Sequence, residues 1–294
     1  MGLDGGGTKT DCVLMDAGGR VLGRGRGGAS NPSRIGFDAA RIGVLAAARA
    51  SLREAGKQIE SVTDVCAGLA GVGRSENAQR MRGELREIFA TAKIEVCTDL
   101  DLGLDAAGLR PAIVLVAGTG SAAIGRDAAG RVARSGGYGP KKGDEGSAFA
   151  VGKSAVEAVQ SAKGEPAADL RGKILEQLSV DSLNKVVGLA DEEADAVYPH
   201  VFPAIANAAD EGNEIARKFL RDAVKSLAEL VAGVQEELKL NGTEFLLGKT
   251  GGMIGSSTFL EETLDAELRR IAPRAKLEIL RTPLAEVAAR RALK

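Results

Sequence analysis

A short glycine-rich segment near the start of the chain carries groups that suit phosphate chemistry. It reads Asp4-Gly5-Gly6-Gly7-Thr8-Lys9-Thr10-Asp11. Glycines leave backbone N–H groups open to a phosphate, because no Cβ stands in the way. Thr8 and Thr10 add hydroxyl donors, and Lys9 adds a positive charge. Asp4 is the candidate ligand for Mg²⁺, held through water because this ion keeps much of its hydration shell.

A second segment of the same kind, Gly118-Thr119-Gly120-Ser121, follows the apolar residues 112–117. Phosphoryl transfer needs many fixed donors and little covalent chemistry from the protein. One glycine run is a weak signal, but two runs at matching places, each followed by a predicted hairpin, predict a phosphate site. The predicted phosphate-binding residues are Gly6, Gly7, Thr8, Lys9, Thr10, Gly118, Thr119, Gly120 and Ser121.

Hydrophobic periodicity predicts strands mixed with helices, and therefore an α/β protein with mixed sheets. The predicted strands are 11–16, 20–26, 62–67, 94–97, 112–117, 122–126, 131–134, 245–247 and 277–280. The clearest predicted helices are 37–55, 76–89, 100–109, 213–238, 258–271 and 283–293. Little strand is expected before the first glycine run.

The repeated glycine run and hairpin indicate two related domains facing a nucleotide cleft. The first is expected at residues 1–110 and the second, with a helical insertion, at 111–282. The terminal helix 283–294 is a candidate to pack back on the first domain.

Charge and composition exclude several functions. A formal net charge of −1 and a pI near 6.1 do not support nucleic-acid binding. No long apolar run or leader pattern is present, so no membrane segment and a cytoplasmic location are expected. Cys12, Cys66 and Cys97 lie in apolar stretches without metal-site spacing, so buried thiols are expected. His200 is too isolated for a metal cluster or a triad.

Two further motifs are incomplete. Residues 247–250, Leu-Gly-Lys-Thr, end like a Walker A loop, but Thr243 stands where its first glycine belongs. Residues 118–123 fit a loose dinucleotide pattern, but a strand is predicted after them where a Rossmann loop opens a helix.

Taken together, the glycine segments resemble the N-acetylglucosamine kinase and BadF/BadG/BcrA/BcrD-type ATPase family of the actin/hexokinase-like superfamily. Asp99, after an apolar stretch, resembles the connecting acidic position of that superfamily. The resemblance runs from residue 3 to residue 294 and is strong through residue 154. The other matching segments are 28–32 (GASNP), 67–71 (AGLAG), 136–147 (GGYGPKKGDEGS) and 247–253.

This resemblance implies two ribonuclease H-like domains and ATP-dependent phosphorylation of an amino sugar, glucosamine or N-acetylglucosamine. The implied ligands are ATP, Mg²⁺ and the sugar, with a homodimer left open. Tyr138 stands where relatives often carry tryptophan, and Lys141-Lys142 where they are usually apolar. The implied adenosine contacts are Gly251 and Gly252. The implied sugar contacts are Asn31, Asp99, Gly137, Tyr138 and Asp144.

The resemblance also implies that Asp99 is the catalytic base. It follows a predicted strand, and reactive groups of α/β proteins collect at the carboxyl ends of strands. One alternative is that Asp99 only caps the helix that begins at Leu100. Asp101 is the nearest rival as base, and Asp144 is a second rival, better suited to holding another hydroxyl.

Two other functions stay open from the sequence. An ATPase activator of a radical dehydratase or reductase would need loop cysteines for an iron–sulfur cluster, whereas the three cysteines lie in predicted strands. A non-enzymatic nucleotide-binding regulatory module is the third interpretation.

Overall fold

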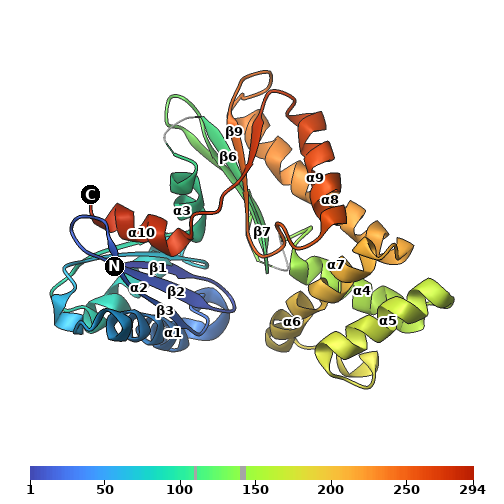
Figure 1. The fold of residues 1–294 in the computed structure, drawn as a ribbon, viewed down its shortest axis with the longest axis horizontal. Helices are drawn as coiled ribbons and strands as arrows, with labels where there is room; N and C mark the ends of the chain where they lie inside the picture. Colours follow the sequence, from blue (N-terminus) through green and yellow to red (C-terminus); the bar gives the residue numbers. More distant parts are fainter. Residues whose placement is uncertain (109–110, 140–143) are drawn as a thin grey trace. The chain divides into compact units, whose positions relative to one another are not determined.

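The computed structural model describes residues 1–108, 111–139 and 144–294, which form two compact units (Figure 1). The first unit joins Met1–Ala106 to Arg281–Lys294, and the second is the continuous stretch Ala107–Leu280. The predicted boundary residue Arg110 and the pair Lys141-Lys142 lie outside the described residues.

The first unit has a five-stranded mixed sheet in the order β3-β2-β1-β4-β5. β1 runs parallel to β4, and β4 to β5, while β1, β2 and β3 form an antiparallel meander. Parallel neighbours end at the same edge of the sheet, so the loops after β1, β4 and β5 lie together there. The strands are β1 Gly2–Gly5, β2 Thr10–Met15, β3 Val21–Gly27, β4 Asp64–Leu69 and β5 Lys93–Cys97.

Four α-helices cover the two faces of this sheet. Leu3 and Cys12 face the core shared with α1 and α2, whereas Cys66 faces α3 and α10. Arg291 of α10 also forms ion pairs with Glu95 and Asp105 of the same unit. The helices are α1 Pro32–Ala55, α2 Ser75–Ile88, α3 Asp99–Ala106 and α10 Leu284–Ala292, with a 3₁₀ turn at Ile59–Ser61.

α1 begins five residues before the predicted start at residue 37. Asn31 caps it by accepting a hydrogen bond from Ser33 N, and Pro32 occupies the first turn, where its missing N–H is no loss. Gly36 has a non-helical backbone with φ of 78°. The turn over residues 32–35 is therefore set off from the body of the helix, next to the first glycine loop.

The second unit repeats the same strand plan, as the two glycine runs predicted. Its sheet has the order β10-β9-β6-β7-β8, with an antiparallel meander β6-β7-β8 and two parallel neighbours, β9 and β10. The strands are β6 Ala112–Ala117, β7 Ser121–Arg126, β8 Val132–Gly136, β9 Leu246–Thr250 and β10 Lys276–Ile279.

The helices of the second unit lie mostly between β8 and β9, as predicted. Leu227, Val231 and Val234 of the amphipathic α8 are buried in the core of this unit. Among the described residues, no helix is both long and apolar enough to cross a membrane. The helices are α4 Ala148–Ser161, α5 Glu165–Leu178, α6 Asp191–Val197, α7 Phe202–Asp210, α8 Glu214–Glu237 and α9 Thr258–Ile271, with 3₁₀ turns Leu183–Lys185 and Tyr198–Val201.

Candidate functional site

The first glycine loop is closed by its own backbone and by the segment between β3 and α1. Gly6 N donates to the Lys9 carbonyl at 2.9 Å, and Ser30 N donates to the Gly6 carbonyl at 3.0 Å. Thr10 is fully buried, and its Oγ1 lies 2.7 Å from both the Gly28 carbonyl oxygen and Ser30 Oγ. Its hydroxyl therefore braces the loop from inside, and a phosphate contact by that hydroxyl stays a prediction.

Thr8 and Lys9 are the exposed residues at the tip of this loop. Lys9 Nζ lies 2.6 Å from Asp11 Oδ2, and Arg26 Nε lies 2.7 Å from Asp11 Oδ1. These two cations hold the pKa of Asp11 below its usual value, against the opposing effect of burial. Lys9 thus adds positive charge at the loop while it is paired with a carboxylate.

A second cation, which the sequence did not indicate, reaches this loop from α1. A Cβ placed on Gly7 would lie 3.0 Å from Arg34 Nη1, so the guanidinium lies directly against the loop backbone. Arg34 belongs to the turn before Gly36, and its backbone N–H donates to the Asn31 carbonyl at 3.1 Å. The signal in the sequence was the Asn-Pro cap, which starts a helical turn beside the loop.

Asp4 lies in β1 with acidic neighbours. Its carboxyl is packed among protein atoms, and this burial, together with the negative charges of Asp99 and Asp11, raises its pKa to about 7; Lys9 opposes the shift. The same effect makes the position favourable for a divalent cation, because a cation would offset the repulsion between carboxylates. A Mg²⁺ contact at Asp4 stays a prediction.

The N-terminus of α3 separates the roles of two neighbouring carboxylates. Asp101 Oδ2 accepts a hydrogen bond from Thr98 N at 2.9 Å, and Asp101 N donates to Thr98 Oγ1 at 3.1 Å. This reciprocal pair is a capping box, so Thr98 is the cap. Asp99 stands at the first helical position, with Oδ1 3.1 Å from Leu100 N.

Asn31 lies against the loop that follows β4. A Cβ on Gly71 would lie 2.1 Å from Asn31 Oδ1, and Ser33 Oγ donates to the Gly71 carbonyl at 2.8 Å. Asn77 Nδ2 donates to the same carbonyl at 2.9 Å. The Asn31 oxygen is thus used in the helix cap, which fixes the direction of its amide group.

The second glycine loop is closed by the start of α4. Gly118 N donates to the Gly120 carbonyl at 2.9 Å, and Ala148 N donates to the Gly118 carbonyl at the same distance. Ser121 is 3% exposed, and its Oγ donates to the Glu145 carbonyl at 2.7 Å. As at Thr10, this hydroxyl is engaged inside the loop, and its contact to phosphate stays a prediction.

Two groups lie beside this loop: the Asp144 carboxyl, against Gly120, and the turn that contains Gly251. A Cβ on Gly120 would lie 2.8 Å from Asp144 Oδ2, so the buried Asp144 carboxyl lies directly against the glycine. Gly251, with φ of 110°, leaves no room for a Cβ, which would lie 2.3 Å from the Ala117 carbonyl oxygen. Met253 N donates to that oxygen at 3.0 Å. The two glycine segments predicted to bind phosphate and adenosine are therefore neighbours within the second unit.

The comparison with protein families agrees with this arrangement. A model of the BadF/BadG/BcrA/BcrD ATPase family matches residues 1–288. The chain belongs to this family. Its fold class, predicted as two actin/hexokinase-like domains, is confirmed by the two five-stranded mixed sheets and by the structural match that follows.

Proteins similar to this chain in sequence or structure carry sugar kinase names. The chain is 29% identical to the N-acetyl-D-glucosamine kinase of Dictyostelium discoideum, over 96% of this chain and 93% of that one. It is 28% identical to the N-acetylmuramic acid/N-acetylglucosamine kinase of Clostridium acetobutylicum, over 94% and 92%. A solved structure from Chromobacterium violaceum, provisionally assigned as an N-acetylglucosamine kinase, is similar with a TM-score of 0.80 and 24% identity, over 100% and 98%.

In this family member, the segment after β8 carries two of the predicted sugar contacts. Gly137 has a left-handed φ of 71°, and its carbonyl accepts a hydrogen bond from Arg134 Nη2. The same guanidinium lies 5.3 Å from the centre of the Tyr138 ring, which is 64% exposed. Arg134 thus orders the backbone at Gly137 and steadies an otherwise open aromatic ring.

The Walker A-like motif and the three cysteines lie in strands of this family member. Lys249 lies in β9 with its side chain buried, not in a phosphate loop. Cys66 and Cys97 lie on adjacent strands with their sulfur atoms 4.0 Å apart. Within residues 1–108, 111–139 and 144–294, no cluster of three or more His, Cys, Asp or Glu could hold a metal ion.

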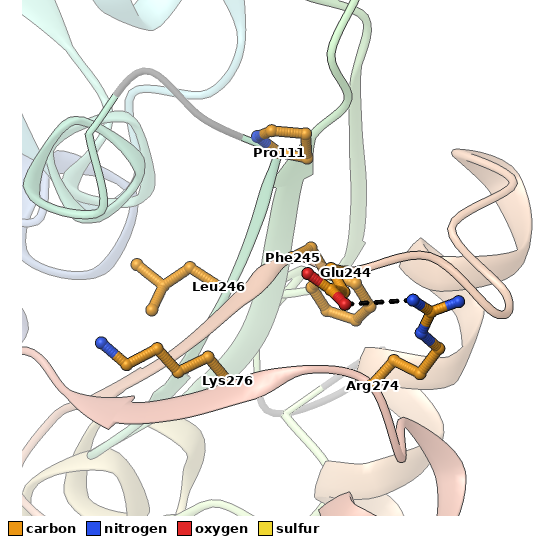
Figure 2. Close-up of a pocket in the computed structure, with 6 residues that line it drawn as sticks. All are labelled: Pro111, Glu244, Phe245, Leu246, Arg274 and Lys276. Carbon is orange, nitrogen blue, oxygen red and sulfur yellow. Dashed lines mark hydrogen bonds and ion pairs between the residues drawn. The ribbon is translucent and has the colours of Figure 1, made fainter.

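A hollow of about 220 Å³ lies at the end of the second sheet that is opposite the glycine loops (Figure 2). Across it, Glu244 Oε1 lies 3.0 Å from Arg274 Nη2. It sits where β6, β9 and β10 begin, whereas the glycine loops follow the ends of β6 and β9. Because α/β proteins bind ligands at the carboxyl ends of strands, we do not assign a function to this hollow. Its lining residues are Pro111, Glu244, Phe245, Leu246, Arg274 and Lys276.

Proposed function

We propose that this protein is an ATP-dependent kinase that phosphorylates a hydroxyl of an amino sugar, N-acetylglucosamine or glucosamine. The observation that carries the proposal is the N-terminus of α3. Asp101 is engaged in a capping box with Thr98, while Asp99 occupies the first helical position, close enough to Asp4 to raise its pKa. The kinase names of the relatives over more than nine-tenths of their lengths support the same reaction.

In this proposal Asp99 accepts the proton of the attacking sugar hydroxyl and fixes its direction toward phosphorus. The sugar is held by Asn31, whose cap fixes its amide, and by the Asp144 carboxyl. The ordered backbone at Gly137 and the exposed Tyr138 ring add further contacts.

The nucleotide is held by both glycine loops. Backbone N–H groups of the two loops bind phosphate oxygens, with Thr8, Lys9 and Arg34 adding donors and positive charge. Mg²⁺, held by Asp4 through water, would neutralise phosphate charge. Adenosine lies against Gly251 and Gly252, which are exposed. The remaining proposed contacts are Gly6, Gly7, Thr10, Gly118, Thr119, Gly120 and Ser121.

The test is a panel of sugars with coupled detection of ADP. The protein is mixed with MgATP and, separately, N-acetylglucosamine, glucosamine, N-acetylmuramic acid or glucose. We expect ADP release to depend on an amino sugar and on Mg²⁺, and to match the sugar phosphate formed. ATP binding without sugar-dependent ADP release across the panel would instead support a nucleotide-binding regulatory module. Rapid ADP release without any sugar would support an ATPase activator.

A further inference from the structure

Lys249 is a fully enclosed lysine next to the segment that we assign to adenosine. Its side chain is 2% exposed, at the second-last position of β9. The backbone on both sides is fixed in the sheet, because Lys249 pairs with Leu115 of β6 and Ile279 of β10. Lysine is rarely buried in this way unless it is paired with charges.

Two carboxylates of α9 receive the lysine. Nζ lies 2.7 Å from Glu261 Oε2 and also contacts Asp265 Oδ1. Glu261 and Asp265 are four residues apart, so they lie on the same face of the helix. The two carboxylates differ in their other contacts, and only one of them connects the lysine to the glycine turn.

Glu261 contacts both Lys249 and the glycine turn. Its other oxygen, Oε1, accepts a hydrogen bond from Gly255 N at 2.8 Å. The turn is also held at its middle, where Met253 N donates to the carbonyl of Ala117, the last residue of β6. Gly251 and Gly252 therefore lie in a turn tied on one side to the end of β6, just before the second phosphate loop, and on the other to Glu261.

A lysine is not needed here to fill space. Buried ion pairs contribute little net stability compared with apolar residues of similar size, because desolvation offsets much of the attraction. What the ammonium adds is a fixed rotamer for Glu261, with one oxygen aimed at Gly255 N. Asp265 instead pairs with a second cation, since its Oδ2 lies 3.7 Å from Arg269 Nη2 on the same helix.

We propose that Lys249 is a positioning residue that, through Glu261, holds the turn at Gly251–Gly255 in the shape that receives adenosine. This inference rests on the proposed function, because it takes that turn as part of the ATP site. Lys249 touches neither the phosphates nor the sugar in this scheme. Its loss should therefore affect nucleotide affinity and leave the sugar and the chemical step alone.

The test compares Lys249→Met and Glu261→Ala with the matched control Asp265→Asn. We expect the first two to raise the Kd for MgATP, measured by calorimetry without sugar, by roughly 10-fold, the size of effect of a lost charge-assisted hydrogen bond. KM for ATP should rise in step, with kcat at saturating ATP and KM for the sugar unchanged. Asp265→Asn should leave the Kd for MgATP near the wild-type value.

A double variant sharpens the comparison. If Lys249 acts through Glu261, Lys249→Met combined with Glu261→Ala should raise the Kd no further than Glu261→Ala alone. Wild-type Kd in both single variants, with only the melting temperature lowered, would overturn the inference. If Lys249→Met does not fold, Glu261→Ala, whose side chain is partly exposed, still decides between the outcomes. A wild-type protein that fails to bind MgATP would instead overturn the proposed function.

Discussion

The Asp144 carboxylate lies against the α-carbon of Gly120, where a Cβ would fall between 2.8 and 3.1 Å from its three outer atoms. Gly120 belongs to the second glycine loop, and Asp144 is a proposed sugar contact. The position of one therefore depends on the size of the other. The absence of a side chain at Gly120 makes room for a protein carboxylate in addition to leaving the loop backbone open.

Gly120→Ala is accordingly expected to displace Asp144 and to lower kcat/KM for the sugar by about 10²-fold, the cost of misplacing a positioning group by an ångström or so. Steady-state kinetics with the amino sugar would measure this. Gly172→Ala in α5, where a Cβ meets nothing within 4 Å, is the control and should keep full activity. Unchanged kinetics in a folded Gly120→Ala variant would remove Asp144 from the site.

Asp99→Asn should lower kcat by roughly 10²–10⁴-fold, as expected for a lost general base, while the melting temperature and MgATP affinity are kept. Asp101→Ala should do the reverse. It breaks the capping box with Thr98 and should cost about 1 kcal/mol of stability, with kcat largely retained. If Asp101→Ala abolished turnover and Asp99→Asn did not, the base would be Asp101.

The stability of the metal-free protein should depend on the ionisation of Asp4. Its pKa is about 7 in the folded protein against an ordinary value of 3.8, so the folded state binds a proton that the unfolded chain has released. Stability should therefore fall as pH rises from about 4 to 7 and level off above that. The shift corresponds to a few kcal/mol, since one pKa unit is about 1.4 kcal/mol.

Thermal unfolding with a chelator present would measure this effect against Asp4→Asn, which carries no charge at any pH. The two proteins should be similar near pH 5, and Asp4→Asn should be the more stable near pH 8. Asp16→Asn is a control, because hydrogen bonds from Arg20 lower the pKa of Asp16 and keep it ionised throughout. A difference between wild type and Asp4→Asn that stayed constant from pH 5 to 8 would contradict the assignment.

The three cysteines should be dispensable for turnover. Burial raises the pKa of the Cys12 thiol to about 12, and a hydrogen bond with Cys66 together with burial raises the pKa of Cys97. Thiols of this kind are poor metal ligands and poor nucleophiles at neutral pH. A variant with alanine at Cys12, Cys66 and Cys97 should keep sugar-dependent ADP release, and the wild type should be colourless. Iron in the purified protein, with activity lost in the folded variant, would favour the dehydratase activator.

Local patterns were enough to predict the two glycine loops and the hairpins after them. Turn glycines and alternating apolar residues are recognisable within a few positions, and the combination of glycine loop and hairpin occurs twice. β1 was missed because Gly2–Gly5 has glycine at both ends and little strand propensity. It forms because β2 and β4 pair with it on both sides, and that pairing is not visible in four residues.

The partners of polar side chains were harder to predict than their presence. Thr10 and Ser121 have the right residue type to bind phosphate, but their hydroxyls are engaged by Gly28, Ser30 and Glu145. Arg34 reaches the first loop from a turn some 27 residues away in sequence, a reach that only the packing of α1 reveals. Such contacts depend on tertiary packing, which overrides what a residue type suggests on its own.

The packing of α10 has a consequence for folding during synthesis of the chain. This helix lies so close to β1 that a Cβ on Gly2 would be 2.1 Å from Ala289 N, and Arg291 binds Glu95 and Asp105. Residues 107–280 leave the ribosome before α10 does, so the second unit has its whole sequence available first. Until α10 emerges, the nascent first unit displays apolar Val13, Met15 and Cys66 to chaperones and proteases. A polypeptide released before residue 281 would keep that apolar face uncovered.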